Sequence, residues 1–158
     1  MRALLCVVAA VWGRGCFGPS TSVRMADGTT KEIAEVQVGD QVRSWDLEKQ
    51  RPVVDVVDGV WRSTGDLYRI HFGDTSILAT ADHPFWSSSQ QSVVSLEPRA
   101  TKSNYGFQEV ELMGEATRFL TLDGSEIPVV GVERAANNTQ VVTLTVTNQH
   151  LFFADGVP

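Results

Sequence analysis

One thiol and one imidazole in this sequence could together carry out nucleophilic chemistry. Cys16 lies between Gly15 and Phe17, and His83 ends the run that begins at Thr80. A thiolate is a strong nucleophile when a base is within reach, and imidazole exchanges protons near neutral pH. Taken alone, Cys16 is more typical of a small buried apolar residue, and a Thr and a His at a strand end are more typical of a turn. The pair is therefore a candidate site whose support must come from the rest of the chain.

The second cysteine bears on how the chain begins. Cys6 lies in an apolar run, residues 3–12, that follows Met1-Arg2 and resembles a short secretory signal. Residues 13–15 include small residues at which a signal peptidase could cut, which would leave Cys16 at a new N-terminus. The alternative is that this segment is a fragment of a longer N-terminal partner. We expect secretion in the first case, and a location set by the parent protein in the second.

Length and composition indicate one globular domain behind a short extension. Of the 158 residues, 42% are hydrophobic and 20% are charged, so the chain can bury a core. We assign residues 1–15 to the extension and residues 16–158 to a single domain. A net charge of −6, with 13 basic residues in no basic run, disfavours nucleic acid and anionic membrane surfaces as partners. We expect a monomer without stable membrane insertion, cofactor or bound metal.

Short runs of β-branched and aromatic residues, separated by turn residues and with almost no helical periodicity, predict an all-β fold. The Asp27-Gly28 pair between two such runs predicts the first hairpin. Further strands are expected at residues 41–45, 53–61, 67–72 and 76–80, with turns at 39–40, 63–66 and 73–74. These strands place Thr80 and His83 on a short, stiff loop directly after a strand end.

The second half of the chain repeats the organisation of the first. A strand at residues 118–122, the Asp123-Gly124 turn and a strand at residues 125–133 suggest an internal pseudo-twofold. The last strands are expected at residues 140–146 and 151–153. The polar segment 87–106 is interpreted as a surface loop. The expected product is a compact β domain with protected edges.

Three separated motifs, in the right order, resemble those of Hint domains, the fold shared by inteins and hedgehog autoprocessing domains. The opening block is Cys16-Phe17, followed by an Asp-Gly turn and the run at residues 38–42. The run from Thr80 to His83 resembles the TxxH block. The strand-like run at residues 142–146, followed by His150, resembles the block near the C-terminus. The resemblance covers nearly the whole chain after the extension and implies a horseshoe-like Hint fold.

The resemblance also implies autocatalytic processing. In this family the nucleophile attacks the carbonyl carbon of the preceding residue, so Cys16 would convert the Gly15–Cys16 peptide bond into a thioester by an N–S acyl shift. His83 would give a proton to the departing amide nitrogen, and Thr80 would hydrogen-bond the scissile peptide or its oxyanion. Water or another nucleophile would then cleave the thioester. The substrate would be the chain's own N-terminal segment.

Departures from the family pattern narrow this expectation. Splicing members end in His-Asn, whereas this sequence ends in Val157-Pro158, so splicing is not expected unless the protein continues. Thr143 stands where many inteins have an aspartate that assists cleavage, while His150 matches a histidine near the C-terminal junction. Sterol transfer of the hedgehog kind is not expected either, because the position of its activating acid falls near Trp61.

Other interpretations stay open. The chain could be a splice-inactive Hint-fold module with a structural or interaction role. A cysteine peptidase that acts on other proteins is the weakest alternative, because papain-like signatures around the cysteine are absent. A zinc ion held by Cys16, His83 and His150 is conceivable, but it would tie up the nucleophile and inhibit it.

Overall fold

The computed structural model describes residues 3–7 and 16–155, and this part of the chain is almost entirely β. The strands are β1 (Ala3–Val7), β2 (Ser22–Arg24), β3 (Thr30–Glu32), β4 (Gln41–Asp46), β5 (Arg51–Phe72), β6 (Thr75–Ala79), β7 (Phe85–Ser87), β8 (Ser92–Ser95), β9 (Glu111–Leu112), β10 (Arg118–Leu120), β11 (Glu126–Val146) and β12 (Leu151–Asp155). The helical elements in the described residues are a 3-10 helix, η1 (Ile33–Glu35), and an α-helix, α1 (Pro98–Tyr105). The predicted all-β class is confirmed.

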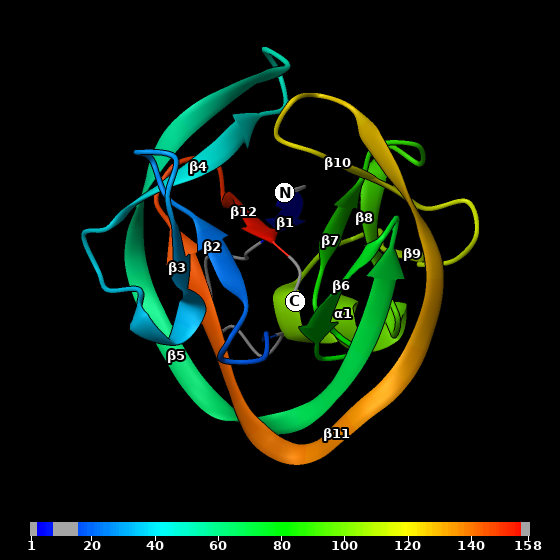
Figure 1. Ribbon diagram of the computed structural model, residues 1–158. Coiled ribbons are helices and arrows are strands. Elements are labelled where there is room, and N and C mark those ends of the chain that lie inside the picture. The colour runs from blue at the N-terminus through cyan, green and yellow to red at the C-terminus, as the bar shows by residue number, and fades with distance from the viewer. Residues whose placement is uncertain (1–2, 8–15, 156–158) are drawn as a thin grey trace.

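Two long strands, β5 and β11, form the frame of the molecule. They pair antiparallel from Phe72 and Val129 at one end to Val57 and Val146 at the other. Figure 1 shows them side by side as curved ribbons with the other strands inside the curve, which is the expected horseshoe-like arrangement. β4 pairs with the first part of β5, and β6 pairs with its last part. Both ends of the frame therefore carry further strands.

The frame strands each join two strands that the sequence predicts as separate. The expected turn at residues 63–66 and the expected break between residues 133 and 140 are wrong, because the ladder continues through both. Turn-forming residues are accommodated there as register shifts on either side of Ala136, and Asn138 takes a positive φ of 46°. Asp66 accepts a hydrogen bond from the Asn138 N–H at 2.8 Å and pairs with Arg134 at 2.8 Å. The turn-forming residues in these two segments therefore make an irregularity in the paired strands and do not reverse the direction of the chain.

The segment interpreted as a surface loop, residues 87–106, contains β8 and α1 instead. Pro98 starts α1, where its missing N–H is no loss, and Gly106 ends it in the left-handed conformation with φ of 74°. Thr101 on this helix is completely buried, so α1 packs on the domain. A helix of only eight residues has too little periodicity to be recognised against a polar background.

Both Asp-Gly turns form as predicted. Gly28 and Gly124 have positive φ values of 88° and 84°, a conformation that glycine adopts without strain. They join β2 to β3 and β10 to β11. The strands predicted at residues 41–45, 76–80 and 151–153 are confirmed as β4, β6 and β12. The internal pseudo-twofold stays a prediction.

The strand β1 lies between β12 and β7 in the sheet order β3-β2-β12-β1-β7-β10-β11-β5-β4. Its backbone pairs antiparallel with β12, from Ala3 opposite Asp155 to Val7 opposite Leu151. These residues belong to the segment assigned to the N-terminal extension. The remainder of that segment, residues 1–2 and 8–15, lies outside the described residues, and its role as signal or partner fragment stays a prediction.

The main core is built around aromatic rings inside the curve of the frame. Phe17 packs edge-on against Phe85 and Phe152, with ring centroids 6.2 and 5.8 Å away, and all three side chains are buried. Because Phe17 follows Cys16 directly, the candidate nucleophile is attached to the core. No helix in the described part of the chain is long and apolar enough to cross a bilayer.

Candidate active site

The backbone around Cys16 is held between β6 and β11. Phe17 exchanges two hydrogen bonds with Val142 of β11, its N–H donating at 2.8 Å and its carbonyl accepting at 2.9 Å. The Gly18 N–H donates to the Leu78 carbonyl of β6 at 3.0 Å. Short bridges to both neighbours fix the direction in which the chain enters the domain. The position of Cys16 is therefore set by backbone geometry.

Thr80 contacts the backbone of Cys16 on both sides. The Cys16 N–H donates to Thr80 Oγ1 at 2.9 Å, and the Thr80 N–H donates to the Cys16 carbonyl at 2.9 Å. Thr80 directly follows β6 and is 8% exposed. The nitrogen that it contacts is the amide nitrogen of the Gly15–Cys16 bond, while Gly15 itself lies outside the described residues.

His83 lies in the same turn, and its ring is packed among aromatic side chains. The backbone N–H of His83 donates to the Thr80 carbonyl at 3.1 Å, and this bond closes the turn. The imidazole centroid lies 4.1 Å from that of Phe17 and 4.8 Å from that of Phe85. The residue is 1% exposed, so the surrounding rings fix the orientation of the imidazole. The structure therefore brings Cys16, Thr80 and His83 together, as predicted by their motifs.

The Cys16 thiol is in its neutral form at ordinary pH. Burial raises its pKa to about 11, a hydrogen bond with Ser63 opposes the rise, and the charge of Asp82 adds to it. The sulfur lies 4.0 Å from Ser63 Oγ, on a part of β5 where the residues are exposed. Any reaction at this sulfur must therefore include removal of its proton.

No hydrogen bond or ring contact joins His150 to these three residues in the described part of the chain. It is exposed, has a positive φ of 56°, and ends the turn that joins β11 to β12. The preceding turn residues are held by Asp55, which is 1% exposed and accepts hydrogen bonds from the N–H groups of Asn148 at 3.0 Å and Gln149 at 2.7 Å. The assignment of His150 to the site stays a prediction.

Three further residues near the site were missed by the sequence reasoning. Asp82 accepts a hydrogen bond from Thr80 Oγ1 at 2.8 Å, and Asn104 of α1 donates to the other Asp82 oxygen at 2.8 Å. Asp82 lies inside the TxxH run, where a turn role was the simpler interpretation. Ser63 was placed in a turn that does not form, and Asn104 in a loop that is a helix. The omissions of Ser63 and Asn104 follow from errors in the expected elements, whereas Asp82 lies in a turn that forms as expected.

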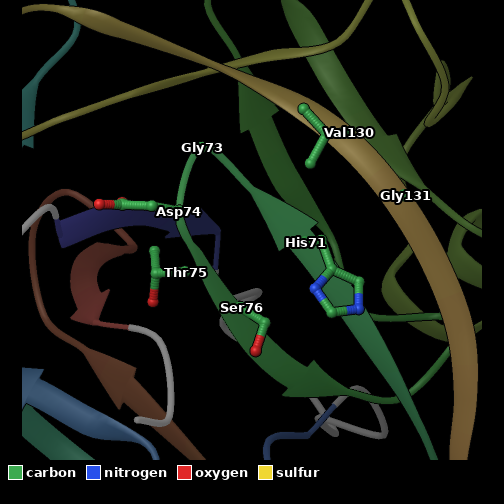
Figure 2. A pocket seen from close by; sticks show the side chains of 7 residues that line it. All are labelled: His71, Gly73, Asp74, Thr75, Ser76, Val130 and Gly131. Atoms are coloured by element: carbon green, nitrogen blue, oxygen red, sulfur yellow. The ribbon is translucent and has the colours of Figure 1, made fainter.

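Two surface cavities differ in their relation to this cluster. One of about 300 Å³ lies beside it and is lined by Thr80, Asp82 and Asn104, among others. A second, of about 460 Å³, lies at the opposite end of β6 and is shown in Figure 2. Its wall carries His71, whose Nε2 atom lies 3.0 Å from Glu133 Oε1. The cavity beside Thr80 is the one that reaches the candidate site.

Comparison with known proteins gives a clear result for the fold. The sequence matches no known protein family and no curated relative. Among solved structures, the gp41-1 intein is 22% identical with a TM-score of 0.67, covering 90% of this chain and 94% of its own. A bacterial intein-like domain from Clostridium thermocellum is 21% identical with a TM-score of 0.65, covering 99% and 95%. The Ssp DnaB mini-intein variant M86 is 13% identical with a TM-score of 0.70, covering 92% and 96%. All three are inteins or intein-like domains. Their TM-scores establish a shared fold, and at these low identities the likeness shows the fold alone.

Proposed function

We propose that this chain, which has the Hint fold of inteins, is an autoprocessing domain that cleaves its own backbone at the Gly15–Cys16 bond. The observation that carries the proposal is the hydrogen bond from the Cys16 N–H to Thr80 Oγ1 at 2.9 Å. A side chain that contacts this nitrogen sits where the peptide bond must break. The buried His83 belongs to the same turn. The similar folds of inteins and of an intein-like domain support the same class of reaction.

The first step is an N–S acyl shift. The Cys16 thiol gives up its proton, Sγ bonds to the carbonyl carbon of Gly15, and the carbon–nitrogen bond breaks. The Cys16 nitrogen leaves as an amine, and the proton that it gains balances the one lost by the thiol. Water then adds to the thioester, releases a carboxylate on Gly15 and restores the thiol.

Each residue of the cluster has a distinct role in this scheme. Thr80 orients the scissile amide nitrogen through its hydroxyl, and its backbone N–H holds the carbonyl of Cys16 on the other side. His83 supplies the proton to the leaving nitrogen, because an amine is expelled far more easily than an amide anion. The rings of Phe17 and Phe85 restrict the imidazole to one orientation and exclude water from it.

The proposal is tested by intact mass spectrometry of the chain with a reporter protein fused before Met1. On incubation with dithiothreitol, we expect a fragment that begins at Cys16. Cys16→Ala should leave the fusion whole, while Cys6→Ala, which removes the other cysteine, should cleave normally. A wild-type fusion that stays whole under thiol would refute the proposal. Cleavage of the Cys16→Ala fusion would assign the cut to another protease.

A second function is favoured by one observation, the 1% exposure of Cys16. A buried thiol with a raised pKa is also what a structural cysteine shows. In that case the chain is a splice-inactive Hint-fold module that serves a structural or interaction role. The same fusion separates the two functions, because the module would stay intact in thiol although it is fully folded.

A further inference from the structure

We propose that Asp82 and Asn104 are positioning residues that determine which atom of the scissile peptide Thr80 acts on. The proposal rests on the proposed function and makes it more specific. Four groups are hydrogen-bonded one to the next in a line. Asn104 Nδ2 donates to Asp82 Oδ2, and Thr80 Oγ1 donates to Asp82 Oδ1. The Cys16 N–H donates to Thr80 Oγ1. The three distances are 2.8, 2.8 and 2.9 Å. The line begins on α1 and ends at the bond that is to be cleaved.

The direction of these bonds follows from counting protons. A threonine hydroxyl has one proton and two lone pairs, and the carboxylate of Asp82 accepts that proton. A lone pair of Thr80 Oγ1 is thereby turned toward the Cys16 N–H. In this state Thr80 cannot also donate to the carbonyl oxygen of the preceding residue. Its hydroxyl therefore orients the nitrogen side of the peptide bond and does not serve as an oxyanion donor.

The helix α1 contacts Asp82 at two points, and Glu97, which directly precedes the helix, contacts the neighbouring Ala81. Besides the Asn104 bond, Thr101 Oγ1 lies 2.9 Å from the Asp82 carbonyl oxygen, and the Glu97 N–H donates to the Ala81 carbonyl at 3.0 Å. Thr101 is completely buried. A turn held from one side by Cys16 and from the other by α1 has little freedom to move. We infer that α1 fixes the carboxylate that orients Thr80.

The first test measures geometry and does not depend on cleavage. In the Cys16→Ala chain, in which the junction stays intact, the backbone amide of residue 16 can be followed by ¹⁵N NMR. Asp82→Ala should move its proton resonance and speed its hydrogen exchange, because the hydroxyl of Thr80 becomes able to rotate. Asp82→Asn, whose side-chain oxygen still accepts the Thr80 proton, should restore both. An unchanged resonance in Asp82→Ala would overturn the proposal.

The second test measures the rate of thiol-induced cleavage in the chain that carries Cys16. Asp82→Ala should slow it by on the order of 10²-fold, the scale expected when a reacting group is misplaced by about an ångström. Asp82→Asn should recover most of the rate. Asn104→Ala should give a smaller loss of rate. It keeps the proposal testable if Asp82→Ala does not fold. Glu97→Ala is the matched control, because it removes an acidic side chain from the same cavity wall but keeps the backbone N–H that contacts Ala81.

The outcomes separate the two proposals. If no variant and no wild-type chain cleaves, the autoprocessing function fails, while the amide measurement still decides the role of Asp82. If the wild type cleaves and Asp82→Ala cleaves at the same rate, the positioning role fails and the function stands. Thermal unfolding of each variant completes the test, because a loss of rate that simply follows a loss of stability would also count against positioning.

Discussion

At the scale of single residues, the Cys16 thiol combines burial with a contact to an exposed strand. Its Sγ atom lies 4.0 Å from Ser63 Oγ, and burial raises its pKa to about 11. The contact with Ser63 opposes this rise, because a hydrogen bond to the thiolate favours the charged form. Ser63 is itself exposed, so the buried thiol has a hydrogen-bond partner that is in contact with solvent.

The reactivity of Cys16 toward iodoacetamide should report this arrangement. In the Cys6→Ala background, we expect alkylation to rise about tenfold per pH unit between about pH 8 and 10, because the thiolate fraction rises in that proportion below the pKa. When the same chain is unfolded in urea, the alkylation rate should level off near the ordinary pKa of a thiol, about two pH units lower.

Ser63→Ala should slow this alkylation severalfold at any pH in that range, because it removes the hydrogen bond that lowers the thiol pKa. The neighbouring Thr64→Ala is the control, since Thr64 is exposed and no bond to the sulfur is assigned to it. Faster alkylation of Ser63→Ala than of the wild type would contradict the assigned direction.

The sequence motifs grouped Cys16, Thr80 and His83, which lie together in the structure, but they did not indicate which residues support these three. The assignment of His150 to the same site stays a prediction. Cys16, Thr80 and His83 come together because three motifs specify the entry of the chain and a strand end. Asp82 and Asn104 were missed because their roles depend on α1, an eight-residue helix in a polar segment. Local pattern cannot show that a short helix docks on a distant turn, because that contact is made in the tertiary structure.

At the scale of elements, the turn between β11 and β12 depends on one buried carboxylate. Asp55 of β5 accepts the N–H groups of Asn148 and Gln149 and a bond from Asn148 Nδ2 at 3.1 Å. These bonds join the frame to the strand β12, which pairs with both β1 and β2. The sequence alone does not show which face of its strand Asp55 occupies, because a register error of one residue reverses the face.

Asp55→Ala should lower the free energy of unfolding by about 1–3 kcal/mol, because three donors of this turn lose a buried carboxylate as their acceptor. Urea unfolding followed by circular dichroism measures this loss. Asp74→Ala, which removes an exposed carboxylate at the turn before β6, should change the midpoint little. Equal effects of the two substitutions would argue against a special role for Asp55.

The close approach of β5 and β11 gives a second prediction at this scale. A Cβ atom on Gly59 would lie 2.5 Å from Thr145 Oγ1 and 2.9 Å from Trp61 Nε1, so these two side chains would have to move. We expect Gly59→Ala to cost about 1–3 kcal/mol of stability by urea unfolding. Gly114→Ala meets nothing within 4 Å and should be close to neutral. If Gly59→Ala leaves the stability unchanged, these two side chains can move aside at little cost.

At the scale of the whole molecule, the core and the candidate site share Phe17. Its ring is completely buried against Phe85 and Phe152, and it also packs on His83. The alternation of apolar residues was enough to predict an all-β core. The long frame was not predicted, because turn residues at positions 63–66 locally favour reversal, whereas continuous pairing with β11 overrides them.

Phe17→Ala should therefore destabilise the protein by about 3–5 kcal/mol, the usual cost of removing a buried aromatic side chain. Phe107→Ala, which removes a half-buried ring packed against a separate cluster of Trp45, Leu120, Leu151 and Phe153, should cost clearly less. Urea unfolding gives both values. A smaller loss for Phe17 than for Phe107 would place the centre of the core elsewhere.

The place of β1 decides what a cut at Gly15–Cys16 would leave behind. Its backbone lies between β12 and β7, so the bonds that hold it are separate from the bond that is severed. The product would then be a nicked protein in which the short peptide stays seated as an inner strand. A denaturing gel would show two species where gel filtration shows one, and release of the peptide would be governed by separation of β1 from β12 and β7, not by the cleavage step.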